Sequence, residues 1–188
     1  MNRPTIRFMN AIQRMDVLFR KALRSNNIAI KELFLSSIIV KLHDQWNYRC
    51  RQIICECYGG AEGKMLFKLQ QAWTNGGRKM GASWEPDWHI PSVSLRAATL
   101  LNIRTVNNLQ NAFGAVTYVD DLRWTRNAIV HNIPGTFRKY QDMALNKYQI
   151  KYISPYEIIL QINPKTGNTI YEDWCNEMTI SLSSAYSQ

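Results

Sequence analysis

The chain has 188 residues, a length typical of one domain, and 46% of them are hydrophobic, which is enough for a substantial core. Its formal net charge is +9, and residues 1–60 carry ten Lys and Arg against four Asp and Glu. This composition argues against intrinsic disorder. The positive charge favours a polyanionic partner or substrate, although a basic surface without a specific partner would have the same composition.

No hydrophobic run reaches the ~20 residues needed to cross a bilayer, and no apolar segment typical of a secretory signal follows Met1. We therefore expect a cytoplasmic protein with reduced thiols and no membrane association. The cysteines are Cys50, Cys55, Cys57 and Cys175. Their spacing matches no usual zinc pattern, and only His43 is near the first three. They are expected to be small buried hydrophobic residues, and neither a metal nor another cofactor is expected.

Two long helices are predicted in the N-terminal third of the chain. The first covers about 4–24, where apolar side chains recur at spacings of three and four. These are Phe8, Ile12, Met15, Phe19 and Leu23. The second covers about 28–57, contains no Gly or Pro, and is ended by Gly59 and Gly60. Its apolar face comprises Leu35, Ile38, Ile39, Leu42, Trp46, Ile53 and Ile54. Helices of this length favour a helical bundle.

Shorter helices are predicted further along the chain. One covers 61–73, and residues 74–91 are expected to be irregular because glycines and prolines recur there. That stretch also holds Trp84 and Trp88, so we expect it to pack against the rest of the protein. The remaining helical segments are predicted at about 94–102, 105–113, 116–132 and 136–148.

The C-terminal region has a different pattern. Residues 156–162 are rich in β-forming side chains, residues 163–168 are typical of a turn, and 169–171 are β-forming again. The pattern predicts a small β-hairpin, followed by a last helix from about Glu172. The predicted fold class is therefore mainly α: a helical bundle with a small C-terminal β-hairpin and a terminal helix. We expect a single domain over 1–188, with 153–171 as a hairpin appendage.

The stretch with the clearest chemistry is Arg126-Asn127-x3-His131, inside the helix predicted at 116–132. Arginine is a permanent cation with a planar set of donors that suits phosphate. Histidine takes and gives protons near neutral pH, and asparagine can both donate and accept hydrogen bonds. Together these groups suit a phosphodiester as substrate.

Helical geometry places the motif on two stripes of side chains, because a helix advances 100° per residue. Asp120, Arg123, Asn127 and His131 form a polar stripe. Ala115, Val119, Leu122, Ile129 and Ile133 form an apolar stripe, which includes Arg126. Arg126 and His131 are about 140° apart, so an ideal helix does not place them side by side. Either the long arginine side chain swings toward the histidine, or a second copy of the helix supplies the complementary group.

A purely structural interpretation of the same residues is also open. An Arg-x4-His spacing occurs often by chance. Arg126 would then extend from the edge of the core toward water, and His131 would be favoured at a helix C-terminus by the helix dipole. The adjacent Asn127, the helical context and the two long preceding helices favour a function.

The motif resembles the Arg-polar-x3-His signature of the HEPN superfamily, many of whose members are metal-independent ribonucleases. The similarity in organisation covers most of the chain: a long helix pair, further helices, then the motif helix. Residues 36–51, with Trp46 and Arg49, are also similar to the second helix of bacterial HEPN families. In one subgroup a tyrosine two residues after the histidine accepts a nucleotide. That position is Ile133 here, so the resemblance does not extend to such regulation.

The resemblance implies a HEPN-like bundle that cuts RNA by attack of the 2′-hydroxyl on the adjacent phosphorus. His131 would act as general base or acid, Arg126 would stabilise the phosphate charge, and Asn127 would orient either group. Asp120, Arg123 and Arg49 are the candidate substrate-binding residues, and no metal is expected. HEPN nucleases are typically dimers, so we expect a homodimer with a composite active site.

The biological role implied is that of a toxin or an anti-phage defence effector, with an antitoxin or a defence complex as partner. Two alternatives belong to other classes of protein. One is a non-catalytic HEPN module that binds RNA or a nucleotide. The other is an all-helical interaction domain in which the motif is structural. Loss of RNA cleavage in His131→Ala would separate the first interpretation from both.

Overall fold

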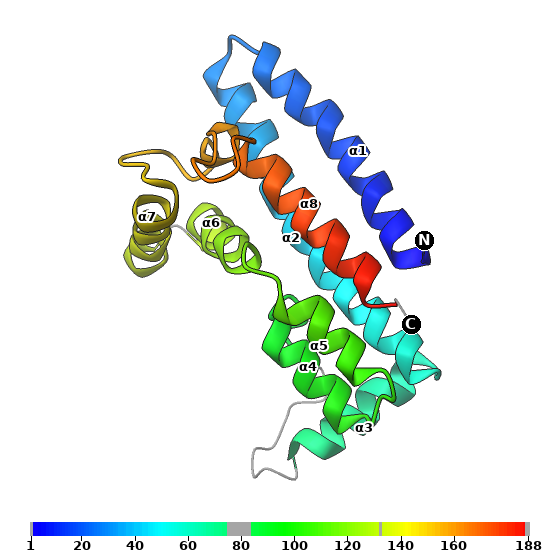
Figure 1. Cartoon of the computed structure of the whole chain (residues 1–188). Helices are drawn as coiled ribbons and strands as arrows, with labels where there is room; N and C mark the ends of the chain where they lie inside the picture. The colour runs from blue at the N-terminus through cyan, green and yellow to red at the C-terminus, as the bar shows by residue number, and fades with distance from the viewer. Residues whose placement is uncertain (1, 75–83, 132, 187–188) are drawn as a thin grey trace. The chain divides into compact units, whose positions relative to one another are not determined.

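A computed structural model of the chain describes residues 2–74, 84–131 and 133–186 (Figure 1). In these residues it has eight α-helices, one 3₁₀-helix and no strand, so the predicted mainly α class is confirmed. The helices are α1 (Arg3–Arg24), α2 (Ile28–Tyr58), α3 (Glu62–Thr74), α4 (Pro91–Leu100), α5 (Val106–Gly114), α6 (Val119–His131), α7 (Pro134–Tyr148) and α8 (Ile170–Ser184), with the 3₁₀-helix η1 (Ile158–Leu160) before α8. Each α-helix matches one that the sequence predicted, whereas η1 lies where a strand was predicted.

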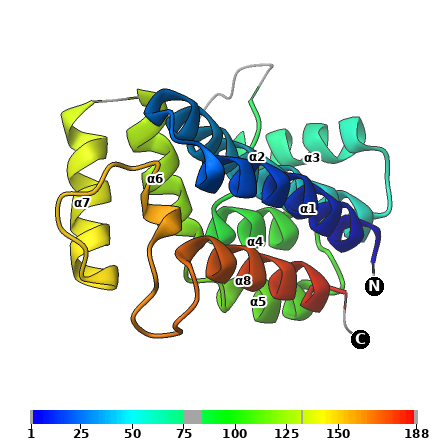
Figure 2. The ribbon, with the colours of Figure 1, turned by 90° about the horizontal axis from the view of Figure 1, so that it is seen from above.

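Contacts along the chain divide it into two compact units. Unit 1 comprises Met1–Ile6, Trp46–Val116 and Ile180–Gln188, and unit 2 comprises Arg7–Gln45 and Thr117–Thr179. In unit 1, α4 packs against α5, and in unit 2 α6 packs against α7 (Figures 1 and 2). The motif helix α6 and its neighbour α7 therefore belong to the same unit.

The apolar faces of α1 and α2 contribute to the core of unit 2. Leu35, Ile38, Ile39 and Leu42 are fully buried, as predicted. On the part of α1 that belongs to unit 2, the buried residues are Phe8, Met15 and Ala22. The prediction that Leu23 joins this stripe was wrong, since it is 58% exposed. Steps of seven residues return to almost the same side of a helix, so Ala22 takes the inward position and Leu23 points about 100° away.

Tryptophans organise the core of unit 1. Trp46 is fully buried, and its Nε1 donates a hydrogen bond to the carbonyl of His89 at 3.1 Å. Trp88 is buried as well, and Trp84 packs against Trp73 with ring centroids 5.0 Å apart. These contacts confirm that the segment around Trp84 and Trp88 packs on the protein. Residues 75–83 of the irregular stretch lie outside the described residues.

The predicted C-terminal hairpin was wrong. The turn is present, with Gly167 at φ +76°, but in the described residues only an isolated antiparallel bridge between Ile162 and Thr169 flanks it. Ile158 and Ile159 are fully buried in η1. Thr169 begins a helix instead of a strand, because its backbone N–H and hydroxyl donate to Glu172 while its hydroxyl accepts from the Glu172 N–H. This reciprocal capping box starts α8.

The cysteines differ in burial. Cys50 and Cys175 are buried, as predicted, and burial raises the pKa of both thiols. Cys55 and Cys57 are only partly buried, so the prediction was wrong for them. They follow the last buried isoleucine of α2, where that helix nears its end at Tyr58. Separately, none of the described helices is both long and apolar enough to cross a membrane.

Candidate catalytic site

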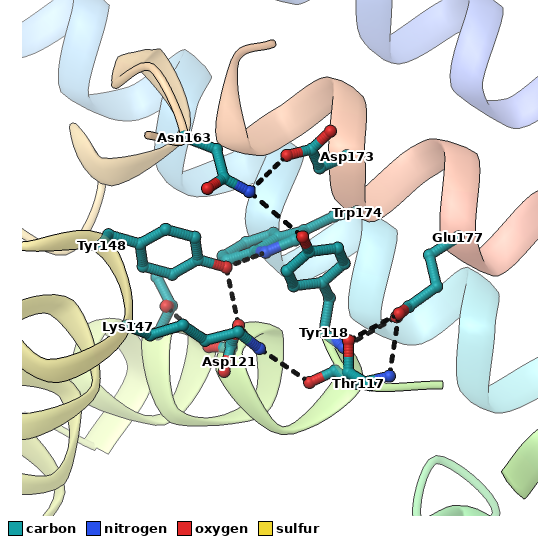
Figure 3. Close-up of polar contacts among 10 residues, drawn as sticks. Thr117, Tyr118, Asp121, Lys147, Tyr148, Asn163, Asp173, Trp174 and Glu177 are labelled. Carbon is teal, nitrogen blue, oxygen red and sulfur yellow. Dashed lines mark hydrogen bonds and ion pairs between the residues drawn. The ribbon is translucent and has the colours of Figure 1, made fainter. Parts of the chain in front are cut away.

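The start of α6 is held by a carboxylate from α8. Glu177 accepts hydrogen bonds from the backbone N–H and the hydroxyl of Thr117 at 2.9 and 2.7 Å, and from the backbone N–H of Tyr118 at 2.7 Å (Figure 3). A helix N-terminus leaves backbone N–H groups without helical partners and carries partial positive charge. Glu177 therefore satisfies donors at this end of α6 and complements its dipole.

The first turn of α6 also contains a buried carboxylate, Asp121, which is 5% exposed. It accepts a hydrogen bond from the hydroxyl of Tyr148 at 2.6 Å and pairs with the Lys147 ammonium at 2.6 Å (Figure 3). The indole N–H of Trp174 in turn donates to the Tyr148 oxygen at 3.0 Å. Asp121 thus joins α6 to the end of α7 and, through Tyr148, to α8.

Burial raises the pKa of Asp121, and the hydrogen bonds from Lys147 and Tyr148 oppose that rise. The pKa of Tyr148 is also raised, mainly by burial and then by the charge of Asp121. A tyrosine in this setting stays protonated and keeps donating to the carboxylate. The cluster is therefore a fixed anchor for α6.

A second cluster extends the anchor to the turn before α8. Asn163 donates to Asp173 and to the Tyr118 hydroxyl (Figure 3). Thr166 and Asn168 also donate to Asp173. Burial by itself would raise the pKa of Asp173, but these three donors outweigh it and lower the pKa. The turn that sequence alone assigned to a hairpin is instead organised around this carboxylate.

At the other end of α6, the structure brings the three motif residues together. Nη1 of Arg126 lies 3.1 Å from Oδ1 of Asn127 and 3.1 Å from Nε2 of His131. The arginine side chain therefore swings toward the histidine, which is the first of the two possibilities left open by helical geometry. Arg126 and Asn127 are half-buried, whereas His131 is exposed. Nε of Arg126 is buried without a hydrogen-bond partner in the described part of the chain.

The nature of the contact between Arg126 and His131 depends on the tautomer of the imidazole. A guanidinium only donates hydrogen bonds, so the contact is a hydrogen bond in the tautomer whose Nε2 lone pair accepts. The arrangement therefore places an imidazole beside a cation that can bind phosphate.

The polar stripe predicted on α6 is present, but the apolar stripe was partly wrong. Asp120 and Arg123 form an ion pair at 2.9 Å. The buried positions of α6 are Val119, Asp121, Leu122, Thr125 and Ala128. Ala115 and Ile133 are exposed, because both lie in the segments that connect α6 to the neighbouring helices. Asp121 and Thr125 can occupy the inward face because each has a hydrogen-bond partner.

Arg49, the remaining predicted substrate-binding residue, lies on the part of α2 that belongs to unit 1. It is 8% exposed, hydrogen-bonds Oε1 of Gln52 at 2.9 Å, and its guanidinium lies 4.8 Å from the Tyr48 ring centroid. The other five candidates are all on α6, in unit 2.

Sequence reasoning missed Trp124, which lies among the motif residues. The guanidinium of Arg123 and the ammonium of Lys139 lie 4.3 and 4.4 Å from its ring centroid. The signal was its position seven residues before His131, which places both on one side of the helix. The partner Lys139 could not be found from α6 alone, since it is on α7.

In the described residues, no group of three or more His, Cys, Asp and Glu side chains is placed to hold a metal ion. Comparisons with protein-family models, with curated proteins and with solved structures found no match to this chain.

Proposed function

We propose that this protein is a metal-independent endoribonuclease that cleaves RNA with Arg126, Asn127 and His131. The observation that carries the proposal is the 3.1 Å contact between Nη1 of Arg126 and Nε2 of His131 within one chain. It puts a phosphate-binding cation and a proton acceptor at one accessible place on α6. The net charge of +9 supports a polyanionic substrate.

The proposed reaction begins when a phosphate of RNA replaces Asn127 and His131 as acceptors of the Arg126 guanidinium. This exchange frees the Nε2 lone pair of His131. His131 then takes the proton of the 2′-hydroxyl, the 2′-oxygen bonds to phosphorus, and the bond to the 5′-oxygen breaks. The 5′-oxygen takes a proton from water or from the protonated His131. The products are a cyclic phosphate and a 5′-hydroxyl.

The roles of the residues follow from this sequence of steps. Acid–base assistance by one side chain is worth about 10²–10⁴-fold in rate. Arg126 stabilises the charge that develops on the non-bridging oxygens, and such electrostatic stabilisation is usually the largest contribution to catalysis. Asn127 holds the guanidinium in place before substrate binds, and Asp120 sets the position of Arg123 for a neighbouring phosphate. DNA lacks the 2′-hydroxyl and should not be cut.

The test is cleavage of total RNA in EDTA by wild type, His131→Ala and Arg126→Ala. Wild type should cleave, and both variants should lose at least about 100-fold in rate while keeping their circular dichroism spectra. Arg126→Lys keeps the charge without the planar donors and should recover little. Arg104→Ala removes an exposed charge from unit 1 and serves as the control. Near wild-type cleavage by His131→Ala would refute the assignment.

Assembly is a second part of the proposal. We propose a symmetric homodimer with a composite site, in which the motif helices of two chains face one RNA strand. The contact between Arg126 and His131 removes the geometric need for a second chain, so this part depends on the HEPN resemblance. Sedimentation should give a dimer, and mixing Arg126→Ala with His131→Ala chains should restore part of the activity. A monomer that cleaves RNA would contradict the composite site and leave the motif assignment intact.

The biological role proposed is that of a toxin or an anti-phage defence effector restrained by a protein partner. Expression of wild type in a host cell should stop growth and fragment RNA, whereas His131→Ala should be tolerated at the same protein level. Equal toxicity of the two chains would contradict the role.

A further inference from the structure

We infer that a groove between α6 and α7 binds one unpaired base of the RNA strand, with the base stacked on Trp124. The inference deepens the proposed function and depends on it for the choice of RNA as ligand. The groove is shallow and open, has a volume of about 430 Å³, and lies in unit 2. Its charged and polar lining comprises Asp121 and Trp124 from α6 and Lys139, Asp142, Asn146 and Lys147 from α7.

The surroundings of Trp124 have the components of a nucleotide site. The ring is half-buried, so part of it is accessible. The cations of Arg123 and Lys139 lie 4.3 and 4.4 Å from its centroid. Proteins that bind single strands combine such aromatic surfaces with cations that contact the backbone phosphates. Exposed Asn146 adds an amide that can donate to and accept from the edge of a base.

The cations next to the ring are suited to exchange partners. A contact between a cation and an accessible aromatic ring is weak, whereas a phosphate offers a full negative charge. When RNA binds, exposed Lys139 can leave the ring for a phosphate, and a base can take its place on the indole. Lys147 is less free to move, because it is paired with Asp121 and donates to the Thr117 carbonyl at 2.9 Å.

The position of Trp124 relative to His131 makes one strand able to reach both. The two residues are seven apart, which is a rise of about 10 Å along the same side of the helix. A base on Trp124 therefore places a nearby phosphate of that strand toward Arg126 and His131. Duplex RNA keeps its bases stacked on one another, so the groove selects single-stranded segments.

The experiment measures binding of a fluorescent single-stranded oligoribonucleotide to the His131→Ala protein, in which the RNA stays intact. Adding Trp124→Ala should weaken binding by about 5- to 100-fold, while Trp124→Phe should keep most of the affinity. Trp73→Ala is the matched control, because Trp73 is also half-buried with an arginine 4.5 Å from its ring centroid. A duplex of the same sequence should show no dependence on Trp124.

A second variant covers the case in which Trp124→Ala does not fold. Lys139→Ala changes an exposed side chain and should weaken binding. It should also reduce the slope of log Kd against log salt concentration by about 1, because one fewer counterion is released. If Trp124→Ala binds as tightly as its parent, or Lys139→Ala leaves affinity and salt slope unchanged, the inference is overturned.

The two proposals fail in distinguishable ways. Cleavage of RNA by wild type with no effect of Trp124→Ala on rate or binding overturns the groove and leaves the ribonuclease assignment intact. RNA that binds through Trp124 but is not cut by wild type supports the groove and refutes the ribonuclease. Absence of any RNA binding overturns both.

Discussion

At its N-terminal end α6 is held by side chains from α7, α8 and the turn before α8 (Figure 3). At its C-terminal end, in contrast, the motif residues contact one another. The first end contains buried Asp121, and the second ends in exposed His131. Asp121 is paired with Lys147 at the first end, and Arg126 contacts His131 at the second. The buried groups of the first end hold the fold, whereas the exposed group of the second end is accessible to a substrate.

This contrast corrects a simple expectation about polar residues in helices. A buried carboxylate with a perturbed pKa is often taken as a sign of catalysis. Asp121 has such a pKa, but it is buried, its Oδ2 is held by both Lys147 and Tyr148, and the proposed reaction does not use it. The candidate chemistry lies instead where the side chains are accessible and can exchange partners.

The largest expected effect on stability comes from the anchored end. Asp121→Ala leaves the buried Tyr148 hydroxyl without its acceptor and Lys147 without its carboxylate, so the free energy of unfolding should fall by about 2–4 kcal/mol. Asp120→Ala is the neighbouring control, since its ion pair with Arg123 is on the surface and is worth about 0–1 kcal/mol. Urea unfolding followed by circular dichroism measures both. If both variants lowered the free energy of unfolding equally, Asp121 would not anchor α6.

The next effect concerns the cap that α8 supplies to α6. Glu177→Ala removes the acceptor of the backbone N–H groups of Thr117 and Tyr118, and should cost about 1–2 kcal/mol. Glu177→Gln keeps an acceptor and should lie between that variant and wild type. Exposed Glu32→Ala provides a control for loss of a negative charge. A Glu177→Ala protein as stable as the control would contradict capping by this residue.

A smaller, pH-dependent effect is expected at Asp173. Three donors lower its pKa in the folded protein, while in the unfolded chain it titrates near its ordinary value of 3.8. Its stabilising contribution is therefore complete above about pH 3.8 and is lost as the pH falls through the lowered pKa. Asp173→Asn should be about 1 kcal/mol less stable than wild type at pH 7, and this gap should close in acid. If Asp173→Asn remained less stable than wild type well below the pH at which Asp173 is protonated in the folded protein, the link between its pKa and stability would be refuted.

The helices themselves could be predicted from the sequence because each is long enough for its apolar spacing to be clear. The hairpin could not be excluded by spacing, because Tyr156 to Ile162 has strand-forming side chains. The capping box of Thr169 and Glu172 was a local signal for a helix at that point, and it was not used. Reading it would have moved residues 169–171 from a strand into the start of α8.

The candidate site was predictable as a set of residues but not as a geometry. Spacing alone placed Arg126 and His131 on different sides of α6, and only the path of the arginine side chain brings Nη1 to Nε2. The roles of Asp121 and Trp124 depend on Tyr148, Lys147 and Lys139. Those residues come from α7, so no pattern within α6 could have identified them.

The smallest effect on stability is expected at the motif itself. This prediction tests most directly the contrast between the two ends of α6. Arg126→Ala and His131→Ala remove contacts among side chains on or near the surface, so each should change the free energy of unfolding by no more than about 0.5 kcal/mol. The same variants should lose RNA cleavage, so activity and stability would separate completely at this end of α6. Denaturant midpoints and cleavage rates measured on one preparation check both statements. If Arg126→Ala instead destabilised the fold as much as Asp121→Ala, its guanidinium would be a structural anchor, and the structural interpretation of the motif would be the better one.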